Sequence, residues 1–257
     1  LFDCERSTVA RLLRRFERLS TRIADVVVTT NETARRRHIN RNRVDPGSIT
    51  VVRNGPDLDL VREVAPAPAA RRDGRTTILY VGSMGRHDGV GELLDAVEVL
   101  VTELGRTDAF CVLVGDGAAG DEVRARCRAL GPEHAIMTGW LDHTEVPAYL
   151  SAADICVAPE PSNEYNDGCT VIKLMEYMAL GKPIVAFDLP EHRVTAGEAA
   201  LYARPNDTRH FAEQLSELMD DEARRHQLGS AARQRVIDQL AWHHQVDDLL
   251  AAYQRLG

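Results

Sequence analysis

Residues 154–187 read DICVAPEPSNEYNDGCTVIKLMEYMALGKPIVAF and contain, in order, the patterns of a strand, a polar loop, a helix and a second strand. The runs 155–158 and 184–187 are apolar, which is typical of strands that are buried on both faces. Between them, apolar residues recur at helical spacing, and Gly181 and Pro183 end that helix. The stretch therefore predicts a β-α-β unit with its helix over residues 170–180.

The same alternation extends over most of the chain. Strands are expected at 77–81, 110–114, 136–138, 155–158, 184–187 and 200–203, and helices at 89–104, 121–130, 144–152, 170–180 and 208–219, with further helices to the end. Apolar strands that alternate with helices form parallel sheets covered on both faces. The sequence therefore predicts an α/β fold with a doubly wound, Rossmann-like parallel sheet, whose ligands bind at the carboxyl ends of the strands.

A smaller αβ unit is expected before residue 57. It has a helix over residues 6–22, a strand over 24–30, a short arginine-rich helix capped by Asn31 and a strand over 49–52. Residues 57–75 have the proline- and alanine-rich composition of a linker. We therefore expect four segments, namely 1–56, a linker over 57–75, a main domain over 76–240 and a terminal helix over 241–257. The chain starts at a leucine, so we expect a fragment or a trimmed sequence.

The composition is that of a soluble globular protein and argues against nucleic-acid-binding and membrane-spanning classes. The 257 residues are 44% hydrophobic and 27% charged, as in soluble globular proteins. A net charge of -8 argues against a nucleic-acid partner, although the arginine-rich runs 11–18 and 35–43 are either solvated helix faces or contacts for anionic lipid. The five cysteines form no CxxC pair and no apolar run is long enough to span a bilayer, which predicts a reduced, cytoplasmic location.

The start of the helix at residue 170 is the first candidate site. The loop before it brings the backbone N–H groups of residues 168–171 to the ligand-binding edge of the sheet, where they favour a phosphate group. Lys173 and Glu176 are three residues apart and point to one side of the helix. A lysine can neutralise a diphosphate and a carboxylate can accept two ribose hydroxyl groups. On spacing alone, an ordinary surface ion pair remains the alternative.

A family resemblance runs through the same region. Glu176 followed by residues 177–186 resembles the motif of glycosyltransferase family 4 (group 1), in which a glutamate precedes an alanine-containing turn, Gly-Lys/Arg-Pro and a strand. Shorter matches to the same family occur in order at 23–27, 53–57, 79–82, 89–94, 114–117, 138–140 and 153–155. Together these matches cover nearly the whole chain.

The resemblance implies a retaining glycosyltransferase with the GT-B fold, in which two Rossmann-like domains face each other. Residues 76–240 would be its nucleotide-sugar domain, residues 1–56 the end of its acceptor-side domain, and 241–257 a helix that packs back toward the latter. The implied catalytic residues are Asp167, Lys173 and Glu176, with Glu176 on the donor ribose. The implied donor-binding residues are Gly82, Ser83, Met84, Gly85, Arg86, Trp140, Asn166, Gly168, Cys169, Thr170 and Val171, with the segment around Trp140 lining the base.

The implied partners are a nucleoside diphosphate sugar and an acceptor that the sequence does not identify. No metal or other cofactor is expected, and no nucleic acid. The expected location is the cytoplasm, with peripheral association at the inner face of the membrane as an alternative. Because only about 55 residues belong to the first domain, we expect the chain to bind nucleotide but to transfer sugar poorly alone.

The sequence also departs from the family pattern. The family's first glutamate corresponds to Gly168, and the neighbouring Asp167 either replaces it or belongs to an ordinary Asp-Gly turn. The family's phosphate-binding arginine and lysine correspond to about Ser83 and Asp88. We expect Arg86 and Lys173 to take over their role.

Other interpretations of the sequence remain. Residues 115–120 fit G-x-G-x-x-G and suggest a nicotinamide cofactor, but they follow the second strand of the domain and no acidic residue ends a strand about 20 residues later. His87 and His192 are expected in loops at the binding edge, either solvated or in contact with a ligand. A nucleotide-sugar 2-epimerase and a non-catalytic nucleotide-sugar-binding protein are the alternative functions.

Overall fold

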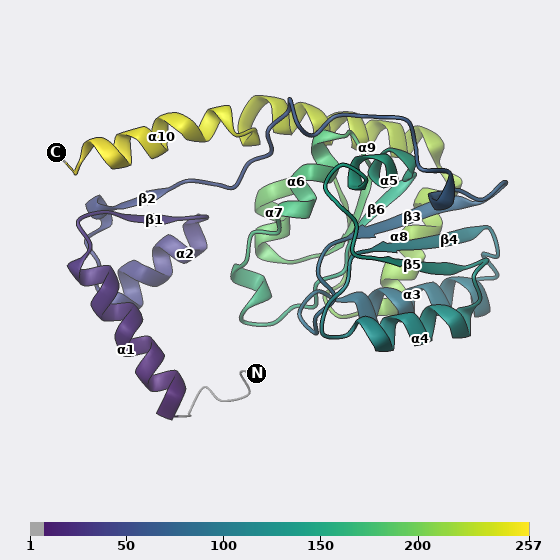
Figure 1. Cartoon of the computed structure of the whole chain (residues 1–257), viewed down its shortest axis with the longest axis horizontal. Helices are drawn as coiled ribbons and strands as arrows, with labels where there is room; N and C mark the ends of the chain where they lie inside the picture. Colours follow the sequence, from purple (N-terminus) through teal and green to yellow (C-terminus); the bar gives the residue numbers. More distant parts are fainter. Residues whose placement is uncertain (1–7, 257) are drawn as a thin grey trace. The chain divides into compact units, whose positions relative to one another are not determined.

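The structure is a computed structural model that describes residues 8–256, and these form two compact units (Figure 1). The larger unit extends from Pro56 to Ala241. The smaller unit combines the described residues up to Gly55 with those from Trp242 onward. The segment 57–75, which was expected to be a linker, contains a short 3-10 helix, η3 (Pro68–Ala70), and no strand.

The larger unit alternates strands and helices as the apolar pattern predicts. Its elements are β3 (Thr76–Val81), α3 (Val90–Thr102), β4 (Ala109–Val114), α4 (Gly120–Leu130), β5 (Ala135–Gly139), α5 (Val146–Ala152), β6 (Ile155–Ala158), η4 (Asn166–Gly168), α6 (Ile172–Ala179), β7 (Ile184–Phe187), α7 (Pro190–Ala196), β8 (Leu201–Ala203), α8 (Thr208–Asp220), α9 (Glu222–Arg235) and η5 (Val236–Leu240). All six strands join one sheet in the order β5-β4-β3-β6-β7-β8, and every pair is parallel. The predicted doubly wound α/β fold is confirmed.

The strand order locates the ligand-binding edge. From β3 the chain moves outward to β4 and β5, then returns to the other side of β3 with β6 and moves outward again. The direction of winding therefore reverses between β3 and β6. In open parallel sheets, ligands bind in the crevice at the carboxyl ends of the two strands that flank such a reversal. A ligand is therefore expected at the loops that follow β3 and β6.

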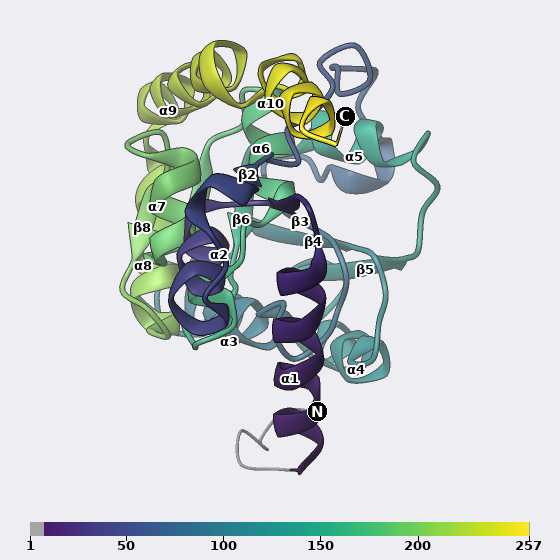
Figure 2. The same cartoon turned by 90° about the vertical axis from the view of Figure 1, so that its left-hand side faces the viewer.

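Side chains that alternate along β3 fill two separate cores, one on each face of the sheet. Ile78 and Tyr80 pack with α3, α4 and α8, whereas Leu79 packs with α5 and α6 on the opposite face. Figures 1 and 2 show the sheet between these two layers of helices. The strands β4, β6 and β7 are buried along their whole length, which is why the sequence shows them as unbroken apolar runs.

Two local differences from the prediction lie near the candidate site. Residues 190–196 form α7, where the sequence suggested only a loop; Pro190 occupies the first turn of this helix, a position that proline tolerates because its missing N–H has no intrahelical partner there. The other difference concerns α6, which begins at Ile172 rather than at residue 170. The residues before it form the 3-10 turn η4, and this turn delays the start of the helix.

The smaller unit has little apolar core. Its elements are α1 (Thr8–Ile23), β1 (Val27–Thr29), α2 (Glu32–Arg37), the π-helix η1 (His38–Asn42), η2 (Pro46–Ser48), β2 (Ile49–Val51) and α10 (His243–Gln254). The strands β1 and β2 pair in parallel, and Val27, Val44 and Ile49 form the buried apolar cluster. Asn31 caps α2 as predicted, because its Oδ1 accepts a hydrogen bond of 2.7 Å from the Ala34 N–H.

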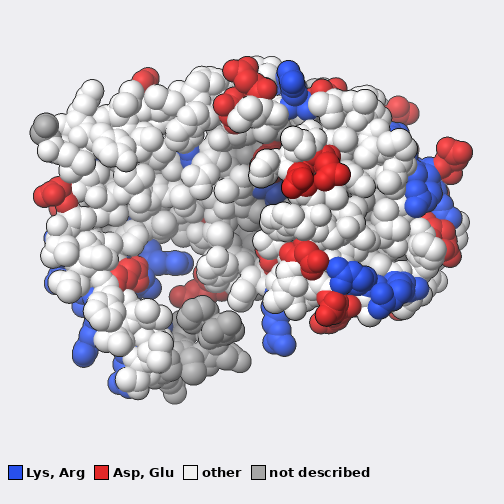
Figure 3. All heavy atoms as spheres, viewed as in Figure 1, with Lys and Arg blue, Asp and Glu red and all other residues white. Residues whose placement is uncertain are grey.

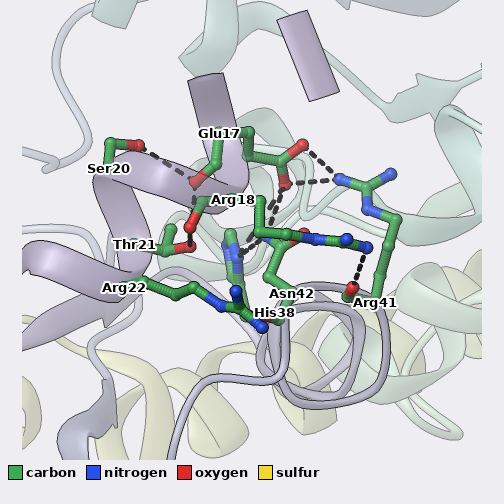
Figure 4. Close-up of polar contacts among 8 residues, drawn as sticks. All are labelled: Glu17, Arg18, Ser20, Thr21, Arg22, His38, Arg41 and Asn42. Carbon is green, nitrogen blue, oxygen red and sulfur yellow. Dashed lines mark hydrogen bonds and ion pairs between the residues drawn. The ribbon is translucent and has the colours of Figure 1, made fainter. Parts of the chain in front are cut away.

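Polar contacts hold α1, which has no buried residue. Glu17 accepts hydrogen bonds from the Arg41 guanidinium and, at 3.2 Å, from the Asn42 amide (Figure 4). Arg18 and Arg22 donate to the carbonyl oxygens of Arg41 and Asn42, at 2.7 and 3.1 Å. Part of the arginine-rich run therefore belongs to the internal structure of this unit.

Candidate functional site

Two segments meet at the carboxyl ends of β3 and β6. We name residues 82–89 the β3 loop and residues 159–171 the β6 segment. Asn166 in the β6 segment is 4% exposed, and its Nδ2 donates to the His87 carbonyl at 3.0 Å and to the Pro161 carbonyl at 2.8 Å. The Asn166 side chain therefore ties the two segments together, and both of its amide protons are used inside the protein.

A cavity of about 670 Å³ opens beside this edge, within the size range of small-molecule sites. Four residues that the sequence predicted for the site line it, namely Gly82, Ser83, Trp140 and Glu176. The remaining lining residues are Leu60, Val61, Arg62, Val81, Val114, Gly115, Leu141, His143, Val146, Pro147, Leu150, Ile172 and Leu180. Most of these are apolar, so the cavity combines an apolar surface with a single carboxylate.

Several lining residues were missed from the sequence. Residues 60–62 were expected to belong to a linker, and no local pattern marks them as part of a site. Val146 and Leu150 are one turn apart on α5, and this spacing indicated a buried helix face without showing that the face borders a cavity. His143 precedes α5 in a stretch that has no recognisable motif.

Glu176 supplies the carboxylate of the cavity. Burial raises the pKa of Glu176, and the nearby Lys173 ammonium opposes that rise. Within the described part of the chain, the Glu176 carboxylate has no hydrogen-bond partner. Its oxygens are therefore available to accept hydrogen bonds from the hydroxyl groups of a ligand.

Lys173 does not line the cavity with Glu176, although the helical spacing suggested that both point to one side. Its Nζ lies 2.7 Å from Oε1 of Glu160, donates to the Tyr80 hydroxyl at 2.9 Å and lies 4.1 Å from the centre of the Tyr80 ring. Burial acts to lower the pKa of Lys173, but Glu160 and Tyr80 outweigh burial and the pKa is raised. No pattern in the sequence marks Glu160 as a site residue.

Tyr80 connects this ion pair to the β3 loop. Its hydroxyl donates to the Ser83 carbonyl at 2.5 Å, and burial raises the pKa of Tyr80 to about 12. Met84 is fully buried in the core, so only its backbone can face a ligand. The Gly85 N–H donates to the Asp88 carboxylate at 2.8 Å. Arg86 is exposed and makes no ion pair with another described residue, which leaves a free cation on this loop.

Residues just before α6 are engaged with one another. The N–H groups of Gly168 and Cys169 donate to the carbonyls of Tyr165 and Asn166, so they do not form the open helix terminus that the sequence suggested. Asp167 accepts a hydrogen bond of 2.9 Å from the Ser162 hydroxyl.

Beyond Cys169, the Thr170 hydroxyl donates to Glu191 at 3.2 Å, and Val171 packs against the core on its way into α6. None of residues 166–171 lines the cavity, and their roles in ligand binding stay predictions.

The glycines of residues 115–120 pack against the β3 loop. A Cβ atom on Gly115 would lie 1.9 Å from the Gly82 carbonyl oxygen, so the two backbones touch there. The Ala119 N–H donates to the Met84 carbonyl at 2.7 Å, and the Gly117 N–H donates to the Asp116 side chain at 2.8 Å. Close packing explains this motif, and nothing in its geometry favours the nicotinamide interpretation.

His192 differs from its prediction. It lies in α7, is fully buried, and its Nδ1 is 2.9 Å from the Phe187 carbonyl oxygen, whereas the sequence suggested a histidine in a loop at the binding edge. Burial lowers the pKa of His192. The ring is therefore neutral at physiological pH, with its proton on Nδ1 facing the carbonyl.

Charges on the larger unit are mixed. Figure 3 shows acidic and basic side chains side by side over α3 and α4, where Arg126 lies 2.6 Å from Asp95 and Arg124 lies 3.0 Å from Asp121. Nucleic-acid-binding domains instead concentrate basic side chains on one face.

Among residues 8–256, no three or more histidine, cysteine, aspartate or glutamate side chains form a group that could hold a metal ion. The four described cysteines are free thiols, and Cys4 lies outside the described residues. No helix in residues 8–256 combines the length and the apolar character that crossing a membrane requires.

Comparison with known families identifies the larger unit. The profile of the family Glycosyl transferases group 1 matches residues 75–221, which is more than half of the chain. The chain belongs to this family. It is 28% identical over 219 residues to 2-deoxystreptamine glucosyltransferase of Streptomyces kanamyceticus, covering 81% of this chain and 54% of that protein.

A further curated relative is glycogen synthase of Mycobacterium tuberculosis, with 29% identity over 202 residues, 76% of this chain and 45% of the relative. The chain thus spans about half the length of the curated relatives it matches.

Solved structures agree on the fold. The S. aureus TarM G117R mutant, solved in complex with fondaparinux, alpha-GlcNAc-glycerol and UDP, has a TM-score of 0.76 at 15% identity and covers 93% of this chain and 46% of its own. Anabaena HepE in complex with UDP and glucose has a TM-score of 0.73 at 18% identity and covers 94% of this chain and 67% of its own.

Proposed function

We propose that this member of the group 1 glycosyltransferases binds a nucleoside diphosphate sugar in the cavity beside β3 and β6, and that it provides the donor site for transfer of a hexose-type sugar to an acceptor with retention of configuration. The acceptor classes that we consider are a glycan, a lipid-linked glycan and a small metabolite. Family membership and the reversal of winding between β3 and β6 support the position of the site.

The observation that carries the proposal is the Glu176 carboxylate. It lies in the cavity wall, is partly buried and has no hydrogen-bond partner among the described residues. Two neighbouring hydroxyl groups of a ribose match two carboxylate oxygens, because each hydroxyl donates one hydrogen bond. Trp140 is 74% exposed at the same cavity and offers an aromatic surface for a base.

The chemical task of such a site is to stabilise the leaving group. As the bond between sugar and diphosphate breaks, negative charge grows on the diphosphate, and a preorganised cation stabilises this state more than the ground state. We assign the stabilisation of the diphosphate charge to two cations. One is Arg86, which is unpaired on the β3 loop, and the other is Lys173, which lies behind that loop. The proposal includes metal-independent transfer, since these cations take the role that a divalent ion would otherwise have.

Ligand binding tests the first step. Calorimetric titration of the chain with UDP-, GDP-, ADP- and dTDP-sugars identifies the base, and Glu176→Ala is expected to weaken binding of the preferred nucleotide by about tenfold or more. Glu164→Ala, an exposed residue of the β6 segment, is the matched control. Equal binding by both variants and the parent would remove the basis of the assignment.

Transfer is tested separately. With a bound donor and a panel of acceptors, NMR of the product is expected to show the anomeric configuration of the donor, and activity is expected to survive a chelator. An inverted product would refute retention. Loss of activity with the chelator and its return with manganese would refute metal independence, and a donor epimerised without acceptor would favour an isomerase.

A further inference from the structure

Glu160 is a buried carboxylate that makes none of the proposed donor contacts. It is the second residue after β6, and its side chain is 5% exposed. Oε1 lies 2.7 Å from Nζ of Lys173, and Oε2 lies 3.7 Å from Nε2 of His192. A carboxylate at this depth is costly unless a cation compensates it, and Lys173 is that cation.

The Lys173 ammonium has one N–H donor left. An ammonium carries three donors. One faces Glu160 and one is given to the Tyr80 hydroxyl, which in turn donates to the Ser83 carbonyl of the β3 loop. Glu160 and Tyr80 therefore hold the ammonium from two sides and leave its third N–H for another acceptor.

The third N–H is close to the cavity wall. A Cβ atom on Gly82 would lie 3.0 Å from Nζ of Lys173, and Gly82 lines the cavity. The ammonium thus occupies space that any side chain at residue 82 would need. It lies directly behind the loop that follows β3, where the diphosphate of a nucleotide sugar is expected.

We propose that Glu160 is a positioning residue for donor binding, which holds a charged Lys173 ammonium against Tyr80 and Gly82 so that its third N–H reaches the diphosphate. This inference rests on the proposed function, because it requires a diphosphate at the β3 loop. Glu160 itself touches no substrate atom; it acts through Lys173.

The charge on Lys173 depends on Glu160. Burial pushes the pKa of Lys173 down, and the Glu160 carboxylate is the strongest influence that raises it. The other titratable groups that face Lys173 are Tyr80 on β3, Glu176 on α6 and His192 on α7. His192 and Tyr80 are neutral near pH 7, because burial lowers the pKa of the histidine and raises that of the tyrosine. Without the Glu160 carboxylate, burial would dominate and the pKa of Lys173 would fall.

A pH series of calorimetric titrations with UDP tests the dependence of the Lys173 charge on Glu160. The variant is Glu160→Gln, and the control is Glu164→Gln, because Glu164 is exposed in the same segment. Glu160→Gln is expected to bind UDP about tenfold more weakly than the parent at neutral pH. Its binding is also expected to weaken further as the pH rises, at lower pH than in the parent, because Lys173 loses its proton earlier. Glu164→Gln is expected to match the parent throughout.

The double variant Glu160→Gln/Lys173→Met guards against misfolding, because it removes both buried charges and leaves no unpaired one. It is expected to fold, to bind UDP as weakly as Glu160→Gln or more weakly, and to show no loss of affinity with rising pH. Parent-like affinity in either variant, or an unchanged pH profile in Glu160→Gln, overturns the inference. Failure of the parent itself to bind any nucleotide would instead overturn the proposed function.

Discussion

The two units of the chain are held together by different interactions. The larger unit buries apolar side chains on both faces of a six-stranded sheet, whereas the buried apolar cluster of the smaller unit contains Val27, Val44 and Ile49. The smaller unit relies on polar contacts around Glu17, and its α1 has no buried residue. Because apolar burial contributes most of the free energy of folding, resistance to unfolding is expected to be uneven along the chain. The candidate site belongs to the unit that has its own core.

The largest expected effect comes from the core of the larger unit. Phe187 is fully buried and packs on Phe211, with ring centres 4.9 Å apart. Phe187→Ala is expected to lower the free energy of unfolding by about 3–5 kcal/mol, because the lost ring leaves a cavity. Urea denaturation followed by circular dichroism measures the change.

Phe16→Ala in α1 is the matched substitution in the smaller unit, where the ring is 58% exposed. Its expected cost is within about 0.5 kcal/mol. If Phe187→Ala and Phe16→Ala lowered the free energy of unfolding by similar amounts, apolar burial would not distinguish the larger unit from α1 of the smaller one.

A buried hydroxyl group gives an intermediate effect. The Tyr177 hydroxyl accepts a hydrogen bond of 2.9 Å from the Val81 N–H at the end of β3. Tyr177→Phe leaves that donor unpaired and is expected to cost about 1–3 kcal/mol. UDP affinity should fall as well, because the β3 loop starts directly after Val81. Tyr253 in α10 is 64% exposed, so Tyr253→Phe should change neither the free energy of unfolding nor the UDP affinity. Equal losses in the two variants would contradict the role given to the Tyr177 hydroxyl.

A smaller effect than that of Tyr177→Phe is expected at Glu17. Burial acts to raise the pKa of Glu17, but hydrogen bonds from Arg41 and Asn42 and the positive charge of Arg41 outweigh it, so the pKa lies below its ordinary 4.5. A lowered pKa stabilises the folded state above the ordinary value, and this contribution is lost as pH falls through the folded pKa. Glu17→Gln is expected to cost about 0.2–1 kcal/mol near neutral pH.

Amide hydrogen exchange of α1 measures that difference, since the helix depends on these contacts. The gap between the parent and Glu17→Gln should narrow as pH falls below 4.5. A gap that stays the same at every pH would show that the carboxylate charge is not what stabilises α1.

Most of the fold was predictable because its signals are local. Apolar runs marked the strands of the larger unit, and Gly181 and Pro183 marked the end of α6. The site was only partly predictable. Glu176 could be found from its helix and its family motif, but the burial of Glu160 depends on Lys173 and His192, which approach it from other elements. A glutamate in a polar loop carries no local sign of such a contact.

Contact between the β3 loop and the end of β4 restricts which residues beside the cavity can be substituted. A Cβ atom on Gly115 would lie 1.9 Å from the Gly82 carbonyl oxygen, so that position has no room for a side chain, whereas a Cβ atom on Gly82 would press against the Lys173 and Tyr80 side chains at 3.0 and 3.1 Å. A library that randomises Gly115 is therefore expected to contain mainly misfolded chains. Substitutions at Trp140, His143 and Arg62 are expected to be tolerated better, since these side chains line the cavity without being part of that contact. We therefore expect any ligand preference of the cavity to respond to substitutions at these three residues and not to substitutions at Gly115.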